Sequence, residues 1–212
     1  VFLKSYALNT GIIQKSDKRK GIPKIKDGTD IDGNYVIIKI WERDKNADDS
    51  DLREIWRNEL RQLHRLAGYP GASEYISELK ETFEDETAFY IVISPGQKTF
   101  LATHLKNANN SIPGEQDRIT FWSNIKRTAL GINILHSQGM LHRKVDEWAI
   151  LTENHLNQED FELTGFEWSM RLSSKASQTN DSGASYSFID DWKGLGSIAA
   201  KGLNINLQRL SD

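Results

Sequence analysis

The sequence of 212 residues contains no cysteine, and none of its apolar runs is longer than a β-strand. Without cysteine, disulfides and thiolate metal sites are excluded, which fits a reducing compartment such as the cytoplasm. The short apolar runs predict no membrane-spanning helix, and the N-terminus lacks the apolar core of a signal peptide. We therefore expect a cytoplasmic protein with no membrane partner. Because the chain starts with Val1, we also expect a processed or excised part of something longer.

The sequence also has no large excess of positive or negative charge, since its net charge is -3. This balance predicts no general attraction to nucleic acid, so nucleic acid is not an expected partner. One stretch near the N-terminus is locally basic, with Lys15, Lys18, Arg19, Lys20, Lys24 and Lys26. No aromatic residue is interleaved with these cations, so we interpret the stretch as a solvated hairpin or loop rather than a nucleic-acid or phosphate contact.

The first half of the chain reads mostly as strands. Tyr35–Trp41 is β-branched and aromatic, and Asp32–Asn34 before it is a typical hairpin turn. Apolar residues at helical spacing predict a helix over Asp51–Ala67. Two more strands are predicted at Tyr75–Phe83 and Ala88–Ile93.

The second half reads mostly as helices. We predict helices at Thr99–Asn107, Gln116–Gln138 and Phe188–Leu203, short strands at Ile150–Thr152 and Phe161–Leu163, and a polar loop over 173–187. Ile119 and Trp122 are counted among the apolar positions of the long helix, and the six tryptophans are interpreted as core or lobe-interface residues. The five histidines show no metal-ligand spacing. The expected class is α+β, with a β-rich lobe over 1–95 that contains one helix and a helical lobe over 96–212.

Four ordered segments resemble the protein kinase family over roughly residues 30–200. Val36–Lys39 looks like the strand whose lysine grips the nucleotide phosphates, and Glu59 stands where the partner glutamate of that lysine would be. Ile134–Leu151 is similar to the helix and catalytic loop, and Phe161–Ser169 is similar to the D-F-G segment. Asp190–Gly196 resembles the start of the buried anchoring helix, with Asp191 as the best match to its aspartate. The resemblance implies a bilobal protein-kinase-like fold whose C-terminal lobe is truncated after the anchoring helix.

The same motifs lack the residues needed for phosphoryl transfer. The H-R-D aspartate, which accepts the proton of the substrate hydroxyl, is replaced by Lys144. The asparagine that binds one magnesium is replaced by Ala149, and the D-F-G aspartate that binds the other is replaced by Gly165. No G-x-G-x-x-G loop is present. The resemblance therefore implies a pseudokinase with no catalytic residue and no metal.

For ligands, the resemblance implies that Lys39 and Glu59 form a phosphate-binding pair and that Ser94 and Gln97 belong to the hinge. We expect no required cofactor, ATP binding without turnover, and a protein partner or other domains of the same polypeptide as the target of regulation.

Three alternatives remain open. The first is an atypical transferase that uses Lys39, Asp146 and Glu167 with a repositioned metal. The second places the metal-binding segment at Asp160–Glu162. The third is a scaffold whose cleft is filled, with Trp148 or Trp168 blocking the nucleotide position.

Overall fold

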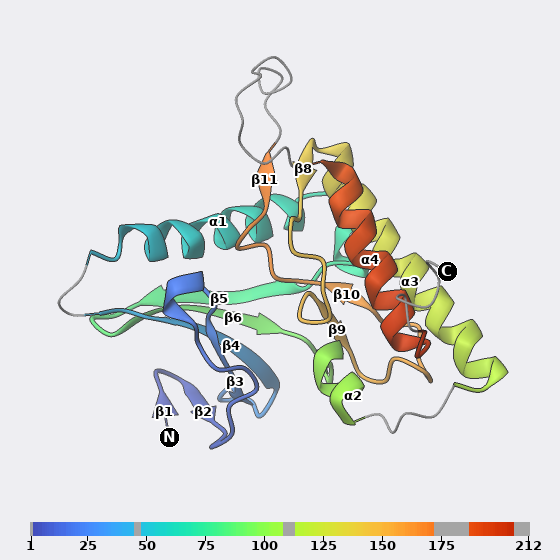
Figure 1. Ribbon diagram of the computed structural model, residues 1–212. Coiled ribbons are helices and arrows are strands. Elements are labelled where there is room, and N and C mark those ends of the chain that lie inside the picture. The colour runs from blue at the N-terminus through green and yellow to red at the C-terminus, as the bar shows by residue number, and fades with distance from the viewer. Residues whose placement is uncertain (1, 45–47, 108–112, 172–186, 206–212) are drawn as a thin grey trace, which may run out of the picture. The chain divides into compact units, whose positions relative to one another are not determined.

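The computed structural model describes residues 2–44, 48–107, 113–171 and 187–205 (Figure 1). It divides into two compact units. The first comprises Val1–Ser73 and Ser77–Gln97, and the second comprises Glu74–Ile76 and Lys98–Asp212. The first holds an antiparallel sheet and one long helix, whereas the second is mainly helical, so the predicted α+β class is confirmed.

The first unit is built on a six-stranded sheet with the order β1-β2-β3-β4-β6-β5, in which all neighbours are antiparallel. Its strands are β1 (Phe2–Leu3), β2 (Tyr6–Leu8), β3 (Lys24–Thr29), β4 (Tyr35–Glu42), β5 (Glu78–Glu84) and β6 (Ala88–Ser94), and its helices are the 3-10 turn η1 (Lys18–Lys20) and α1 (Ser50–Ala67). A second 3-10 turn, η2 (Ala72–Glu74), follows α1. The predicted strand and turn at 32–41 are confirmed, since Gly33 has a φ of +80° and Asp30 accepts the amides of Asp32 and Asn34.

Strand β4 is buried on both faces, which explains its nearly continuous apolar sequence. One face joins a cluster of Tyr6, Val36, Ile38, Ile40, Ala88, Tyr90 and Val92. Because side chains alternate along a strand, Ile37, Lys39 and Trp41 share the opposite face. Helix α1 lies along the sheet in Figure 1, and its Trp56 stacks on Phe89 of β6 with ring centroids 5.0 Å apart.

The second unit packs helices against short strands. Its helices are α2 (Leu101–Asn107), α3 (Glu115–Ser137) and α4 (Phe188–Gly202), and its strands are β7 (Thr99–Phe100), β8 (Met140–Leu141), β9 (Ile150–Thr152), β10 (Glu162–Leu163) and β11 (Met170–Arg171). Helices α3 and α4 lie side by side in Figure 1. They approach closely at Gly202, where an added Cβ would be 2.1 Å from the ring of Phe121. No helix in the described ranges is long and apolar enough to cross a membrane.

Several sequence predictions were wrong in detail. Strand β5 begins at Glu78 rather than Tyr75, because the Tyr75 carbonyl instead accepts the amide of Leu163 at 2.7 Å in the second unit. Thr99 and Phe100 pair with β9 as a strand and are not the first turn of a helix. The predicted loop 173–187 lies outside the described residues except for Ser187, the N-cap of α4.

The apolar face predicted for the long helix was also partly wrong. Ile119 is 53% exposed and Trp122 is 52% exposed, because the buried face of α3 runs instead through residues such as Phe121, Ile132 and Leu135. Trp192 on α4 is 40% exposed, so two of the six tryptophans are not core residues.

Candidate functional site

Lys39 and Glu59 form a buried ion pair inside the first unit. Lys39 lies in the middle of β4, flanked by β3 and β6, and its Nζ is 2.5 Å from Oε1 of Glu59 on α1. The lysine side chain is 3% exposed and the glutamate side chain is fully buried. The structure therefore brings together the two residues that the sequence pattern paired, although their role in binding phosphate stays a prediction.

Two periodicities produce this pair. Alternation along β4 places Lys39 between Ile37 and Trp41 on the face that meets α1. On α1, helical spacing places Glu59 on the same stripe as Trp56 and Leu63, both of which are buried. A buried charge persists only when it is paired and hydrogen-bonded, so each residue of the pair depends on the other.

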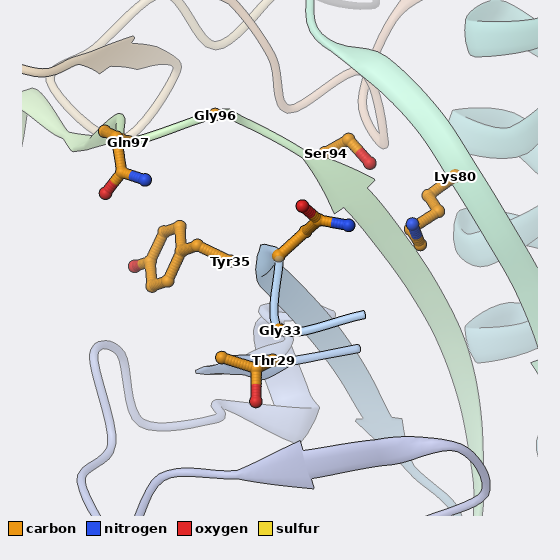
Figure 2. Close-up of a pocket in the computed structure, with 8 residues that line it drawn as sticks. Thr29, Gly33, Tyr35, Lys80, Ser94, Gly96 and Gln97 are labelled. Carbon is orange, nitrogen blue, oxygen red and sulfur yellow. The ribbon is translucent and has the colours of Figure 1, made fainter. Parts of the chain in front are cut away.

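The expected hinge residues Ser94 and Gln97 lie in a different place in the first unit. They line a pocket of about 510 Å³ together with Thr29, Gly33, Asn34, Tyr35, Lys80 and Gly96 (Figure 2). Lys80 stands at its edge and donates to Asp30 at 2.8 Å, which holds the pKa of that carboxyl well below its usual range. Lys39 and Glu59 are not among the lining residues, so the expected cofactor-binding set falls into two separate groups within this unit.

At the tip of the β2–β3 hairpin, several backbone amides are used in bonds within the turn. The hairpin ends in the turn η1, where the amide of Lys20 donates to the Asp17 carbonyl and the amide of Gly21 donates to the Lys18 carbonyl. The amide of Ile22 also donates to the Asp17 carbonyl. These three backbone donors are used inside the turn, in agreement with the missing glycine motif.

In the second unit, His142 is a structural residue of the catalytic-loop segment. It is fully buried, and burial lowers its pKa, so the neutral imidazole is favoured. Its Nδ1 accepts the amide of Lys144 at 3.3 Å, which leaves Nε2 as the donor to the Thr164 carbonyl at 2.9 Å. The ring therefore ties this loop to the strand that precedes Gly165.

Asp191 on α4 holds the same loop from the other side. Its two carboxylate oxygens accept the amides of His142 at 2.8 Å and Arg143 at 2.7 Å. Arg143 has a φ of +69°, a conformation that costs a non-glycine residue roughly 1–2 kcal/mol. An added Cβ at Gly194, one turn along α4, would be 2.4 Å from the Val145 carbonyl. The helix and the loop backbone are thus in direct contact.

The three positions that the resemblance aligns with the catalytic residues of the family lie in this loop and in the segment after β10. The ammonium of Lys144 lies 3.7 Å from a carboxylate oxygen of Glu167, whose side chain is 6% exposed. Ala149 is buried and carries no oxygen on its side chain. Gly165 has a φ of +81°, and its Cβ position is 3.6 Å from Glu167 Oε2, so the backbone and the neighbouring carboxylate both disfavour an aspartate there.

Asp146, the suggested replacement base, is partly buried in this unit. Desolvation raises its pKa despite the nearby cation of Lys144, and the Asp146 carboxylate accepts the amide of Trp148 at 2.8 Å.

The ring of Trp148 packs against Phe100 with centroids 5.5 Å apart. Blocking of the nucleotide by Trp148 or Trp168 stays a prediction.

The alternative metal-binding segment at Asp160–Glu162 is disfavoured by geometry. One oxygen of Asp160 accepts the Thr152 hydroxyl, and the other accepts the amide of Glu153, each at 2.6 Å. Glu162 pairs with Lys98 at 2.5 Å. Both carboxylates therefore hold neighbouring segments of the chain. Across the described residues, no group of three or more His, Asp or Glu side chains is placed to hold a metal ion.

Sequence reasoning missed the Lys144–Glu167 ion pair, although the signal was present. Two family positions had changed to residues of opposite charge, Lys144 for an aspartate and Glu167 for a glycine. Opposite charges introduced at two neighbouring positions of a site predict that they pair.

With the sheet, the buried ion pair and the catalytic-loop segment described, comparison with known families gives the class of the protein. The family model of the protein kinase domain matches residues 24–189. This match covers more than half of the chain, so the chain belongs to the protein kinase domain family.

Proposed function

We propose that this chain is a pseudokinase domain, which acts as a regulatory, nucleotide-sensing or protein-interaction module and not as a phosphotransferase. The observation that carries the proposal is the ion pair between Lys144 and Glu167. It puts a cation at the position of the family's proton acceptor, and the acid nearest to that cation is already engaged with it.

The chemistry of phosphoryl transfer depends on groups that these positions do not supply. A proton acceptor near neutral pH must be unprotonated, whereas a lysine with an ordinary pKa is a cation. The phosphates also need metal ions bridged by oxygen ligands, and neither Ala149 nor Gly165 offers a side-chain oxygen. Losses at three positions with three separate roles support an inactive domain more strongly than any single loss.

The first unit supports the nucleotide-sensing part of the proposal. Lys39 and Glu59 keep the pairing that positions the lysine for nucleotide phosphates in this family. A domain with this pair but without metal ligands fits a nucleotide that is bound as a structural ligand and is not consumed. The output would then be a change in the surface offered to a protein partner or to other domains of the polypeptide. The cysteine-free composition supports a reducing compartment such as the cytoplasm.

Thermal unfolding with saturating ATP tests this proposal. ATP at 100 times its dissociation constant should raise the midpoint by about 5–10 °C. We expect the rise without magnesium, and we expect it to be absent in the double variant Lys39→Met with Glu59→Leu, which removes the lysine without leaving the Glu59 carboxylate buried alone. The matched control is Lys193→Ala, an exposed lysine on α4, which should keep the full rise. No rise in the unsubstituted protein would remove the nucleotide-sensing function and leave a scaffold.

The competing function is an atypical nucleotide-dependent transferase, favoured by the partly buried carboxyl of Asp146 and its raised pKa. A general base works best when its pKa is near the operating pH, so the direction of this shift suits that role. Metal-dependent consumption of ATP that is lost in both Asp146→Asn and Glu167→Gln would establish it and contradict the inactive domain.

A further inference from the structure

The β2–β3 hairpin ends in a turn that displays three consecutive cations, and we call residues Asp17–Ile22 the basic turn. Lys18, Arg19 and Lys20 are all exposed. Within the described part of the chain, Lys20 makes a long ion pair with Asp17 at 3.7 Å, with the lysine side chain 75% exposed, and the ammonium of Lys18 donates to the Arg43 carbonyl at 3.4 Å. The turn thus carries a local excess of positive charge on a chain whose net charge is -3.

The basic turn is held in one conformation by hydrogen bonds at its base and to β4. Asp17 and Ile22 exchange two backbone hydrogen bonds across its base, at 3.0 and 3.1 Å. Gly21 closes the turn with a φ of +61°, a value that glycine adopts without strain. The indole of the buried Trp41 donates to the Gly21 carbonyl at 3.1 Å and fastens the turn to β4. The backbone carrying the cations is therefore ordered before any partner arrives.

Such a cluster is unfavourable in the isolated molecule. Like charges repel, by about 1 kcal/mol per pair at about 4 Å in water, and by less at larger separations or where salt screens them. A flexible loop relieves this repulsion by spreading its charges, but a turn with a fixed backbone does so less well. An anionic partner removes the repulsion. Because the backbone of the turn is already ordered, the turn loses little conformational entropy when it binds.

We propose that the basic turn is a docking point for an acidic segment of a protein partner. Three cations on one turn match a short cluster of carboxylates in size and charge. Nucleic acid fits less well, because tight binding to a duplex needs many phosphate contacts and single strands are held largely by stacking on aromatic side chains. Residues 9–24, which include the whole turn, contain no aromatic side chain. The inference goes beyond the proposed function and holds whether or not the domain transfers phosphate.

Fluorescence anisotropy with a labelled synthetic peptide, a run of glutamates between neutral flanks, tests the inference. We expect saturable binding that weakens as salt is raised from low to physiological concentration. Reversing the three charges (K18E, R19E and K20E together) should weaken binding at least about tenfold. The matched control reverses three exposed cations elsewhere (R57E, K126E and K193E together), and it should change the affinity by less than about twofold. The thermal midpoints of both triple variants identify any loss of folding.

Trp41→Phe keeps every charge but removes the donor to the Gly21 carbonyl, so it tests the ordered backbone separately from the charge. If the fixed turn matters, this variant weakens binding of the glutamate peptide several-fold at an unchanged net charge. Three results would overturn the inference. They are no binding of the peptide, equal losses in the two triple variants, and tighter binding of a single-stranded oligonucleotide of equal charge at the same turn.

Discussion

Each unit contains several Lys–Glu ion pairs, and the two that involve kinase-motif positions, Lys39–Glu59 and Lys144–Glu167, differ in almost every physical respect. Lys39 and Glu59 are 2.5 Å apart, and their side chains are 3% and 0% exposed. Lys144 and Glu167 are 3.7 Å apart, and the lysine side chain is 29% exposed. The first pair is tied to a central strand and a long helix, whereas the second joins a loop to a short connecting segment.

This comparison shows that Lys–Glu pairs of the same chemistry can contribute very differently to stability. Breaking a fully buried pair strands a charge in an apolar interior, so the first pair is a condition for folding of its unit. A pair that is longer and has one partly hydrated partner loses less when it opens, although Glu167 is itself buried. Stability therefore depends mainly on Lys39–Glu59, the pair that is typical of the family. Lys144–Glu167, which is not typical of the family, can be rearranged at a lower cost in free energy.

The most severe test of the contrast is Lys39→Met. It leaves the Glu59 carboxylate buried without its cation and should lower the free energy of unfolding by about 3–5 kcal/mol. Urea denaturation followed by tryptophan fluorescence measures the change. The double variant Lys39→Met with Glu59→Leu removes both charges and should recover most of the loss. Equal losses in the single and double variants would show that the pair is not coupled.

A somewhat smaller loss is expected from Asp191→Ala. This change removes the acceptor of the His142 and Arg143 amides, and each buried donor left without an acceptor costs about 1–3 kcal/mol. We expect about 2–4 kcal/mol in thermal unfolding. The control Asp191→Asn keeps one carbonyl oxygen, so a loss as large as that of alanine would contradict the assignment to hydrogen bonding.

Acidic pH should weaken the second unit through its buried histidines. Burial, aided by the nearby His104, lowers the pKa of His155 to about 4 from a usual 6.5. Between these two pH values the unfolded chain binds more protons than the folded chain, so stability falls as the pH falls through this window. His142, with its pKa also lowered by burial, acts in the same direction.

We expect a loss of roughly 2 kcal/mol between pH 6.5 and pH 4 from His155, measured as the pH dependence of urea denaturation. His155→Gln should flatten this dependence. His64→Gln, at an exposed position on α1, should leave it unchanged. A slope that is the same in all three proteins would rule out the role of His155.

The smallest effect is expected at the second pair. Lys144→Met should lower the free energy of unfolding by about 1 kcal/mol, less than Lys39→Met, because the buried Glu167 loses a cation that is partly hydrated and 3.7 Å away. The same denaturation experiment provides the measurement, with Lys193→Met as the exposed control. A loss comparable to that of Lys39→Met would remove the distinction between the two pairs.

Much of this architecture could be predicted from local patterns. Strand β4 and helix α1 followed from apolar periodicity, and the order of the kinase-like segments led to the pairing of Lys39 with Glu59. The start of β5 could not be predicted, because it is decided by a bond between the Tyr75 carbonyl and the Leu163 amide, far apart in sequence.

The candidate site shows the same limit. The substitutions of family motif residues by Lys144, Ala149 and Gly165 could each be recognised in the sequence from a single position. The opposite charges of Lys144 and Glu167 indicated that the two could pair, but the 3.7 Å separation of their side chains depends on how the loop and the segment after β10 are placed. That placement comes from contacts between segments far apart in sequence, which residue types alone do not show.

The contact of α4 with the loop of His142 and Arg143 also has a consequence in time. Their amide protons are bonded to Asp191, and Gly194 lies directly against the Val145 carbonyl. These protons can exchange with solvent only when α4 leaves the loop. Their hydrogen-exchange rate therefore reports how often this helix opens. The backbone of the loop can therefore be remodelled no faster than α4 detaches.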